Sequence, residues 1–197
     1  MRPGVSSTAQ RLWLVRHAQP IIEPGVCYGA LDVPAQPEAT QTAAQRLAGV
    51  LPFGAELWTS PLQRCECLAQ ALKALRPDFL LKTEARLREM NFGAWEGLRW
   101  DDVPRAELDA WAADFAHHRC GGAQSVAQLM AQVASCWDAW RALPRPRPVV
   151  WVTHAGVIRA AWLLAQGRRH IEQAQDWPAH GLDWGEGQVL EVPASAP

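Results

Sequence analysis

The sequence predicts a three-layer α/β/α fold built around a mostly parallel sheet. Short apolar runs, typical of buried strands, alternate along the chain with longer stretches in which apolar residues recur at helical spacing. Of the 197 residues, 49% are apolar and 20% are charged, so a sizeable core can form. The sequence contains no internal repeat and no long linker, and we therefore expect one domain over residues 1–197.

The first strand is predicted at the apolar run Leu12–Val15. The segment before it, residues 1–10, is small and polar, and we expect a loose tail there. Four prolines and two glycines between residues 19 and 37 predict a long loop. A helix should follow over Glu38–Val50, because Pro37 suits the first turn of a helix.

The middle of the chain continues the alternation of strands and helices. Glu56–Thr59 predicts a second strand. We expect Ser60 to be the N-cap and Pro61 the first residue of a helix that continues over Leu62–Leu75. A third strand is predicted at Phe79–Lys82.

The second half predicts a loop rich in glycine and aromatic residues, three helices, a stiff connector, a fourth strand and a C-terminal hairpin. In chain order, we expect a loop at Glu89–Trp100, helices at Asp102–His118 and Ser125–Leu143, the connector Arg145-Pro146-Arg147, a strand at Pro148–Val152, a helix from about Gly156 to Ala165 and the hairpin at Asp183–Val192.

Charge and cysteine content limit the function classes. The formal net charge is −1, with 19 basic and 20 acidic residues, so no basic bias draws the molecule toward nucleic acid or an anionic membrane. An odd number of scattered cysteines, five in all, argues against a disulfide framework. The sequence shows neither a membrane-spanning apolar run nor the apolar core of a signal peptide, and we expect a cytoplasmic protein.

Two predicted strands end in the same way. One runs into Arg16-His17 and the other into Thr153-His154. A single histidine after a strand is more often structural, but two in matching positions favour a site, because ligands of open α/β sheets bind beyond the carboxyl ends of the strands. The helix that begins near Gly156 would direct its amide groups to the same crevice, which favours an anion.

Two further residues are candidates for this site. Arg64 lies in the first turn of a predicted helix, where the helix dipole disfavours a cation, so a bound phosphate would explain it better than solvent exposure. Glu89 precedes the loop rich in aromatic residues and could donate a proton to a leaving group. Taken alone, Glu89 would be an ordinary loop carboxylate, whereas for Arg64 a phosphate ligand and a solvent-exposed surface position both remain open.

These residues lie in four motifs that together resemble the histidine phosphatase superfamily, which includes the cofactor-dependent phosphoglycerate mutases. The motifs follow the family's order over about residues 11–167, and they are Leu14–Ala18, Ser60–Arg64, Glu89–Gly97 and Val152–Arg159. The resemblance implies that His17 is a nucleophile that forms a phosphohistidine, and that Glu89 is the general acid and then the base for water. It further implies that Arg16, Arg64 and His154 hold the phosphoryl oxygens, without a metal ion or other cofactor.

The residues after Glu89 separate branches of the superfamily. Phosphoglycerate mutases carry Arg-His-Tyr-Gly there, whereas this chain has Met-Asn-Phe-Gly at 90–93, which favours hydrolysis over a mutase cycle. The motif Trp95-Glu96-Gly97, together with Trp100 and the segment Tyr28–Pro34, looks like the α-ribazole phosphatases. The resemblance therefore implies a phosphatase for a small phosphomonoester, with α-ribazole phosphate as one candidate.

Departures from the family pattern concern the substrate more than the chemistry. Ala18 replaces a glycine, Gln19-Pro20 replace Glu-Thr, and Glu23 stands where many members have asparagine. A carboxylate beside a phosphate pocket would repel the substrate unless this loop runs differently. Trp95 and Trp100 are expected either to pack under the loop or to stack on an aromatic leaving group.

Three alternatives remain open on the sequence. They are a mutase, a phosphate-binding regulatory module without turnover, and a zinc hydrolase that uses His17 and His154. Loss of His17 or Glu89 would mark the binding module, and neither residue is lost. The sequence does not specify an oligomeric state.

Overall fold

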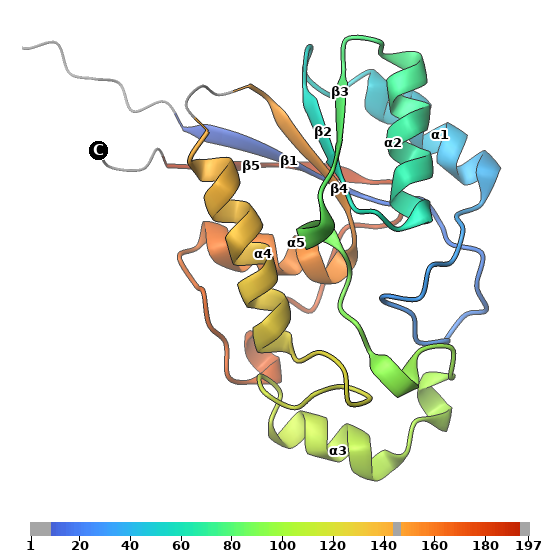
Figure 1. Ribbon diagram of the computed structural model, residues 1–197, viewed down its shortest axis with the longest axis vertical. Helices are drawn as coiled ribbons and strands as arrows, with labels where there is room; N and C mark the ends of the chain where they lie inside the picture. Colours follow the sequence, from blue (N-terminus) through green and yellow to red (C-terminus); the bar gives the residue numbers. More distant parts are fainter. Residues whose placement is uncertain (1–8, 144–146, 194–197) are drawn as a thin grey trace, which may run out of the picture.

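A computed structural model describes residues 9–143 and 147–193 of the chain. Within these residues, five strands form one sheet in the order β3-β2-β4-β1-β5 (Figure 1). The sheet is parallel except for the edge strand β5, which runs antiparallel to β1. The strands are β1 Gln10–Arg16, β2 Glu56–Thr59, β3 Leu80–Thr83, β4 Val149–Thr153 and β5 Gly187–Val192. The predicted mostly parallel α/β fold is confirmed.

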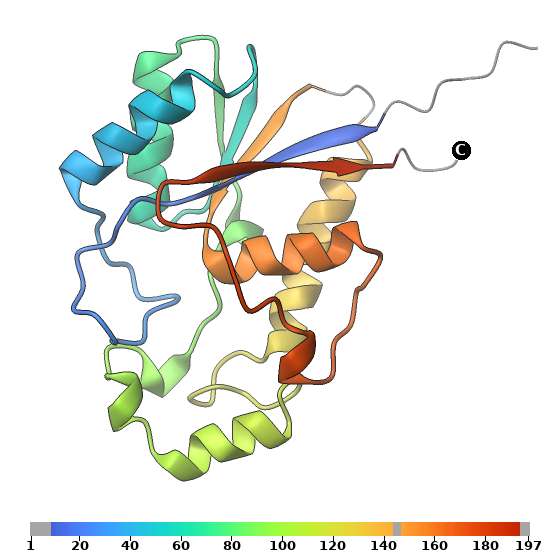
Figure 2. The ribbon, with the colours of Figure 1, turned by 180° about the vertical axis from the view of Figure 1, so that it is seen from behind.

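Helices cover both faces of the sheet. They are α1 Pro37–Ala48, α2 Gln63–Leu75, α3 Arg105–Ala113, α4 Val126–Arg141 and α5 Ala155–Ala165. Helices α1 and α2 lie on one face, and α4 and α5 lie on the other (Figures 1 and 2). Alternate residues of β4 point to opposite faces of the sheet: Val150 and Val152 pack with α1 and α2, whereas Trp151 packs with α4 and α5. Among the described helices, none has the length and apolar character needed to cross a membrane.

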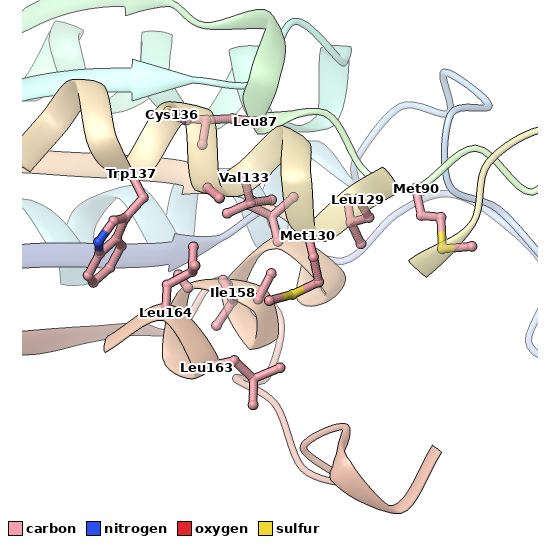
Figure 3. Close-up of a cluster of buried hydrophobic side chains, with 14 of the residues drawn as sticks. Leu87, Met90, Leu129, Met130, Val133, Cys136, Trp137, Ile158, Leu163 and Leu164 are labelled. Carbon is pink, nitrogen blue, oxygen red and sulfur yellow. The ribbon is translucent and has the colours of Figure 1, made fainter. Parts of the chain in front are cut away.

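The α4–α5 contact is a closely packed apolar layer. Leu129, Met130 and Val133 of α4 meet Ile158 and Leu163 of α5 (Figure 3), and all five side chains are buried. Burial of each such side chain contributes about 1.5–3 kcal/mol to the free energy of folding. Because α5 begins directly after β4, this layer also fixes the turn between them.

Two predicted elements at the ends of the sheet are wrong in detail. The hairpin at Asp183–Val192 does not form, and only the strand Gly187–Val192 is present. The segment before this strand bonds to the chain after β1 instead, since Gly185 N–H donates to the His17 carbonyl (2.9 Å) and Arg16 N–H donates to the Glu186 carbonyl (3.0 Å). The first strand begins at Gln10, inside the expected tail, because that residue pairs with Val192 of β5.

Two predicted helices also differ from the structure. Helix α3 covers only Arg105–Ala113, because Pro104 precedes its first turn in an extended conformation and the chain leaves helical geometry at Asp114. Helix α2 begins at Gln63 and its N-cap is Leu62. Ser60 lies two residues before this N-cap, and its hydroxyl accepts the Leu62 N–H (3.3 Å). Helix α4 has the predicted N-terminus, with Ser125 in a capping box. Residues 1–8 of the expected tail, and 145 and 146 of the connector, lie outside the described residues.

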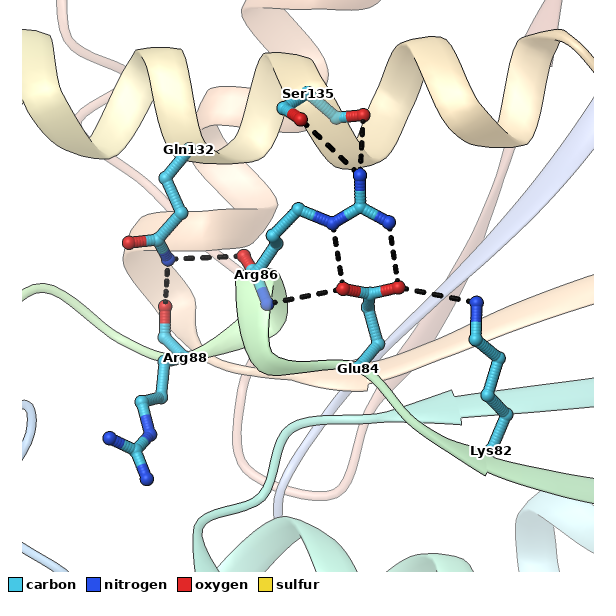
Figure 4. A network of polar contacts seen from close by, with 6 residues as sticks. All are labelled: Lys82, Glu84, Arg86, Arg88, Gln132 and Ser135. Atoms are coloured by element: carbon cyan, nitrogen blue, oxygen red, sulfur yellow. Dashed lines mark hydrogen bonds and ion pairs between the residues drawn. The ribbon is translucent and has the colours of Figure 1, made fainter.

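A long excursion between β3 and α4 carries α3, which lies apart from the sheet (Figure 1). The excursion starts at Glu84, whose carboxylate accepts two hydrogen bonds from the Arg86 guanidinium (2.7 and 2.8 Å) and one from the Lys82 ammonium (3.2 Å) (Figure 4). The hydrogen bonds from Arg86 are the main cause that lowers the pKa of Glu84 to about 2.

The same network ties the excursion to α4. Arg86 donates to the carbonyl and hydroxyl oxygens of Ser135, and the Gln132 amide donates to the carbonyls of Arg86 (3.0 Å) and Arg88 (2.9 Å) (Figure 4). Arg88 directly precedes Glu89. The network therefore holds the backbone just before Glu89 in place.

Candidate active site

The structure brings the two predicted histidines together at the carboxyl ends of neighbouring strands. Arg16 of β1 pairs with Thr153 of β4, so the next residues, His17 and His154, lie side by side. The His17 N–H donates to the Thr153 carbonyl (3.0 Å), and the two ring centroids are 5.2 Å apart. The parallel register of the central strands thus produces the juxtaposition.

The His17 ring is held in one tautomer. Its Nδ1 lies 2.7 Å from the Ala18 carbonyl oxygen, which can only accept, so Nδ1 carries the proton and Nε2 keeps its lone pair. The ring is 2% exposed. Burial, with the positive charges of Arg64 and Arg16, lowers the pKa of His17 to about 3. The imidazole is therefore neutral at pH 7, which is the nucleophilic form.

His154 is also a buried, neutral ring. Burial and then the positive charge of Arg64 lower its pKa well below the usual range. Its Nε2 lies 2.8 Å from the Ser60 hydroxyl and 3.5 Å from the Cys65 sulfur. Burial raises the pKa of the Cys65 thiol, so this neighbour stays protonated and uncharged. Ser60, expected to cap α2, fixes the orientation of His154 instead.

Arg16 and Arg64 supply positive charge beside the histidines. The Arg16 Nη1 donates to the Leu182 carbonyl (2.8 Å), and the guanidinium of Arg64 donates to the carbonyls of Gly29 (2.6 Å) and Leu31 (2.9 Å). Both side chains have an Nε that is buried without a hydrogen-bond partner among residues 9–143 and 147–193. A buried N–H group without a partner is costly, so these two donors favour an anion between them.

Arg159 of α5 is a third cation at the site, and the sequence reasoning did not select it. Within the part of the chain that the structure describes, its Nε is likewise buried without a partner, and its Nη2 makes a long contact of 3.5 Å to the Ala179 carbonyl. Burial lowers the pKa of its guanidinium. Arg159 lies one turn after Ala155, at the start of a helix that follows the His154 strand. That helical spacing was the signal that could have identified it.

Glu96 connects the Trp-Glu-Gly motif to Arg64. Its carboxylate accepts the N–H groups of Gly29 (3.1 Å), Ala30 (2.8 Å) and Leu31 (2.5 Å). The carbonyls of Gly29 and Leu31 hold the Arg64 guanidinium. Glu96 therefore orients Arg64 through the backbone of this turn, a role that the sequence does not reveal.

Glu89 lies at the N-terminus of α5. Its carboxylate accepts the N–H of Gly156 (2.9 Å) and of Met90 (3.0 Å). A Cβ atom at position 156 would lie 2.3 Å from Glu89 Oε1, so the approach requires glycine. The expectation that α5 directs an amide toward the crevice holds for Gly156, and the acceptor that this amide binds is a carboxyl oxygen of Glu89.

One cavity of about 610 Å³ connects these groups; Arg16, His17, Arg64, Glu89, His154 and Arg159 all line it. Glu23 is exposed and is not part of the lining. Trp95 is 1% exposed and packs under the loop, whereas Trp100 lines the cavity. Residues 9–143 and 147–193 hold no group of three or more His, Cys, Asp or Glu side chains arranged for a metal ion.

The chain matches the family model of the histidine phosphatase superfamily (branch 1) over residues 12–184. A glucosyl-3-phosphoglycerate phosphatase of Mycobacterium tuberculosis is 32% identical over 187 residues, with 88% of this chain and 81% of that protein covered. The native structure of a mycobacterial glucosyl-3-phosphoglycerate phosphatase gives a TM-score of 0.74 at 27% identity and covers 92% of this chain and 89% of that chain. Its complex with inorganic phosphate gives 0.71 at 26% identity, with the same coverage.

The chain therefore belongs to the histidine phosphatase superfamily. Within that superfamily it is a phosphatase, a phosphoric monoester hydrolase.

Proposed function

We propose that this phosphatase hydrolyses a small phosphomonoester through a phosphohistidine on His17, without a metal ion. The observation that carries the proposal is the state of the His17 ring: it is neutral, its Nδ1 proton is bound by the Ala18 carbonyl, and its Nε2 is free among cations. A neutral imidazole so placed is a nucleophile toward phosphorus.

In the first step, Nε2 of His17 attacks the phosphorus atom. The new P–N bond forms as the P–O bond to the alcohol breaks, and Glu89 gives its proton to the departing oxygen. The Nδ1 proton stays on the ring, where the Ala18 carbonyl stabilises the positive charge of the phosphorylated imidazole. Arg16 and Arg64 bind the phosphoryl oxygens and offset the charge of the transition state.

In the second step, water attacks the phosphohistidine. Glu89, now ionised, takes a proton from the water, the P–N bond breaks, and inorganic phosphate and neutral His17 are restored. His154 contributes a hydrogen bond to the phosphoryl group from its buried position beside Ser60.

The finer question is which ester is cleaved. α-Ribazole phosphate is one candidate, on the resemblance of the motif at Trp95-Glu96-Gly97. Glucosyl-3-phosphoglycerate is a second, because relatives that are 32% identical carry that name. Both belong in the first substrate screen.

The decisive experiment measures hydrolysis of p-nitrophenyl phosphate with EDTA present, in the wild type and in His17→Ala. Activity that survives EDTA and is lost in His17→Ala supports the proposal, and ³²P labelling of the wild-type protein should then show an acid-labile phosphohistidine. Loss of activity with EDTA would support the zinc alternative. Equal activity in the two proteins would remove His17 as the nucleophile. Stoichiometric phosphate binding without turnover of any ester would support a binding module, and phosphoryl transfer to a phosphoglycerate would support a mutase.

A further inference from the structure

The lining of the active-site cavity includes a group of neighbouring aromatic rings. Phe92, Trp100, Trp111, Phe115 and Trp177 all line it, and we refer to these five residues as the aromatic wall. They come from the excursion that carries α3 and from the C-terminal segment after α5. The wall begins three residues after Glu89, the group that would protonate the leaving alcohol.

The rings of the aromatic wall contact one another in a continuous series. The centroids of Phe92 and Trp100 are 5.5 Å apart and edge to face, and those of Trp111 and Phe115 are 5.6 Å apart and stacked. Trp100 stacks with Trp111 at 6.4 Å, and Phe115 meets Trp177 at 6.3 Å. Because these spacings are typical of favourable ring pairs, each ring holds its neighbours in place and the wall is preformed.

The lining of the cavity combines charged and apolar side chains. The cations Arg16, Arg64 and Arg159 line it together with His17 and Glu89, and the apolar side chains of Val26 and Leu129 line it with the aromatic wall. An occupant that fits this lining carries an anionic head and an apolar body.

We propose that the aromatic wall binds the alcohol portion of the substrate and that this portion carries an aromatic ring system. The inference rests on the proposed function, since it takes the phosphoryl group to lie at His17. An aromatic body is favoured over a sugar or glycerate because free hydroxyl groups would lose their water against the wall with almost no partners in return.

The test compares two primary alkyl esters whose leaving alcohols have similar basicity, 2-phenylethyl phosphate and ethyl phosphate. The wild type should prefer the phenylethyl ester by about tenfold or more in kcat/KM. The cyclohexylethyl ester should fall between the two, because it is apolar but cannot stack. A ratio near one for phenylethyl over ethyl would overturn the proposal.

Variants then assign the preference to the aromatic wall. Trp100→Leu and Trp111→Leu should each lower the ratio of kcat/KM for phenylethyl over ethyl phosphate several-fold. Trp111→Phe keeps a ring and should retain the preference. Trp13→Leu is the matched control, because Trp13 packs with the core on the opposite face of the sheet. An unchanged preference in both wall variants would also overturn the proposal.

The outcomes separate this proposal from the proposed function. If His17→Ala keeps its activity, the phosphohistidine mechanism is wrong, whichever ester the wild type prefers. If His17 is required and the two esters react equally, the mechanism stands and the aromatic wall is not a substrate site. Should the leucine variants fail to fold, the wild-type ratio of the three esters decides alone.

Discussion

Replacement of Gly156 by alanine should displace Glu89 without unfolding the protein. The added Cβ would lie 2.3 Å from Glu89 Oε1 and 3.1 Å from its Cδ. Ordinary contact requires about 3.5 Å, so the carboxylate must retreat by about 1 Å. The three atoms nearest to the new methyl group all belong to the end of the Glu89 side chain, which can move, and alanine is favoured over glycine in a helix by about 1 kcal/mol. The free energy of unfolding should therefore be unchanged or slightly higher.

The kinetic cost should depend on the leaving group. A displacement of about 1 Å in a reacting group costs on the order of 10²-fold in rate. Ethyl phosphate has a poor leaving group that needs the proton from Glu89, so its kcat should fall by about this factor. The nitrophenolate of p-nitrophenyl phosphate leaves with little proton assistance, and its rate should fall by less than about tenfold.

The assay is steady-state hydrolysis of both esters by the wild type, Gly156→Ala and Glu89→Gln, together with thermal unfolding of each protein. The two variants should show the same pattern. Gly49→Ala is the matched control, because a Cβ there meets only the Arg46 carbonyl at an ordinary 3.5 Å. Equal losses on both esters, or no loss on either, would refute the reasoning that Glu89 donates its proton from the position held by the Gly156 amide.

Three other predictions follow from the same geometry. Glu96→Gln should raise the inhibition constant of inorganic phosphate about tenfold through the loss of Arg64 orientation, while Glu66→Gln, at a half-buried position of α2, should leave it unchanged; equal constants in the two variants would contradict this role. Glu84→Gln should lower the free energy of unfolding by about 1.5–3 kcal/mol in denaturant titrations. The pKa of Glu84 is about 2 in the folded protein and 4.5 ordinarily, so this difference in stability between wild type and variant should be present above about pH 4.5 and vanish as the pH falls toward 2. The ¹⁵N shifts of the His17 ring should stay those of the neutral, Nδ1-protonated form from pH 8 to pH 5, since its pKa is about 3; a titration near pH 6.5 would show that the ring is not buried as described.

Features that depend on neighbouring residues were predictable from the sequence. The apolar run of β4 and its continuation into His154 identify both the strand and the histidine, because strand period and chain direction are local properties. The pairing of His17 with His154 followed from one topological rule, that ligands bind at the carboxyl ends of parallel strands. Arg64 was selected from its place in the first turn of a predicted helix, where a cation is disfavoured. Glu89 needed the family resemblance, since a lone loop glutamate has no local signature.

Features that depend on distant contacts were missed. Glu96 acts on Arg64 through a turn that lies more than 60 positions away in sequence, as its contacts with Gly29 and Leu31 show. The hairpin at the C-terminus was wrong because Gly185 bonds to the chain after β1, a partner that no local pattern indicates. The aromatic wall required knowledge of where α3 lies relative to Trp177, which tertiary contacts alone determine.

The position of β1 in the sheet has a consequence for synthesis on the ribosome. β1 precedes β2 and β3 in the chain, yet both of its neighbours in the sheet, β4 and β5, follow them. Until β4 has emerged, only β2 and β3 can pair, and the apolar residues of β1 remain unprotected. Long-range parallel pairing closes slowly, because the loop entropy must be overcome before the contacts form. The phosphate site should therefore form only after residue 154 has left the exit tunnel.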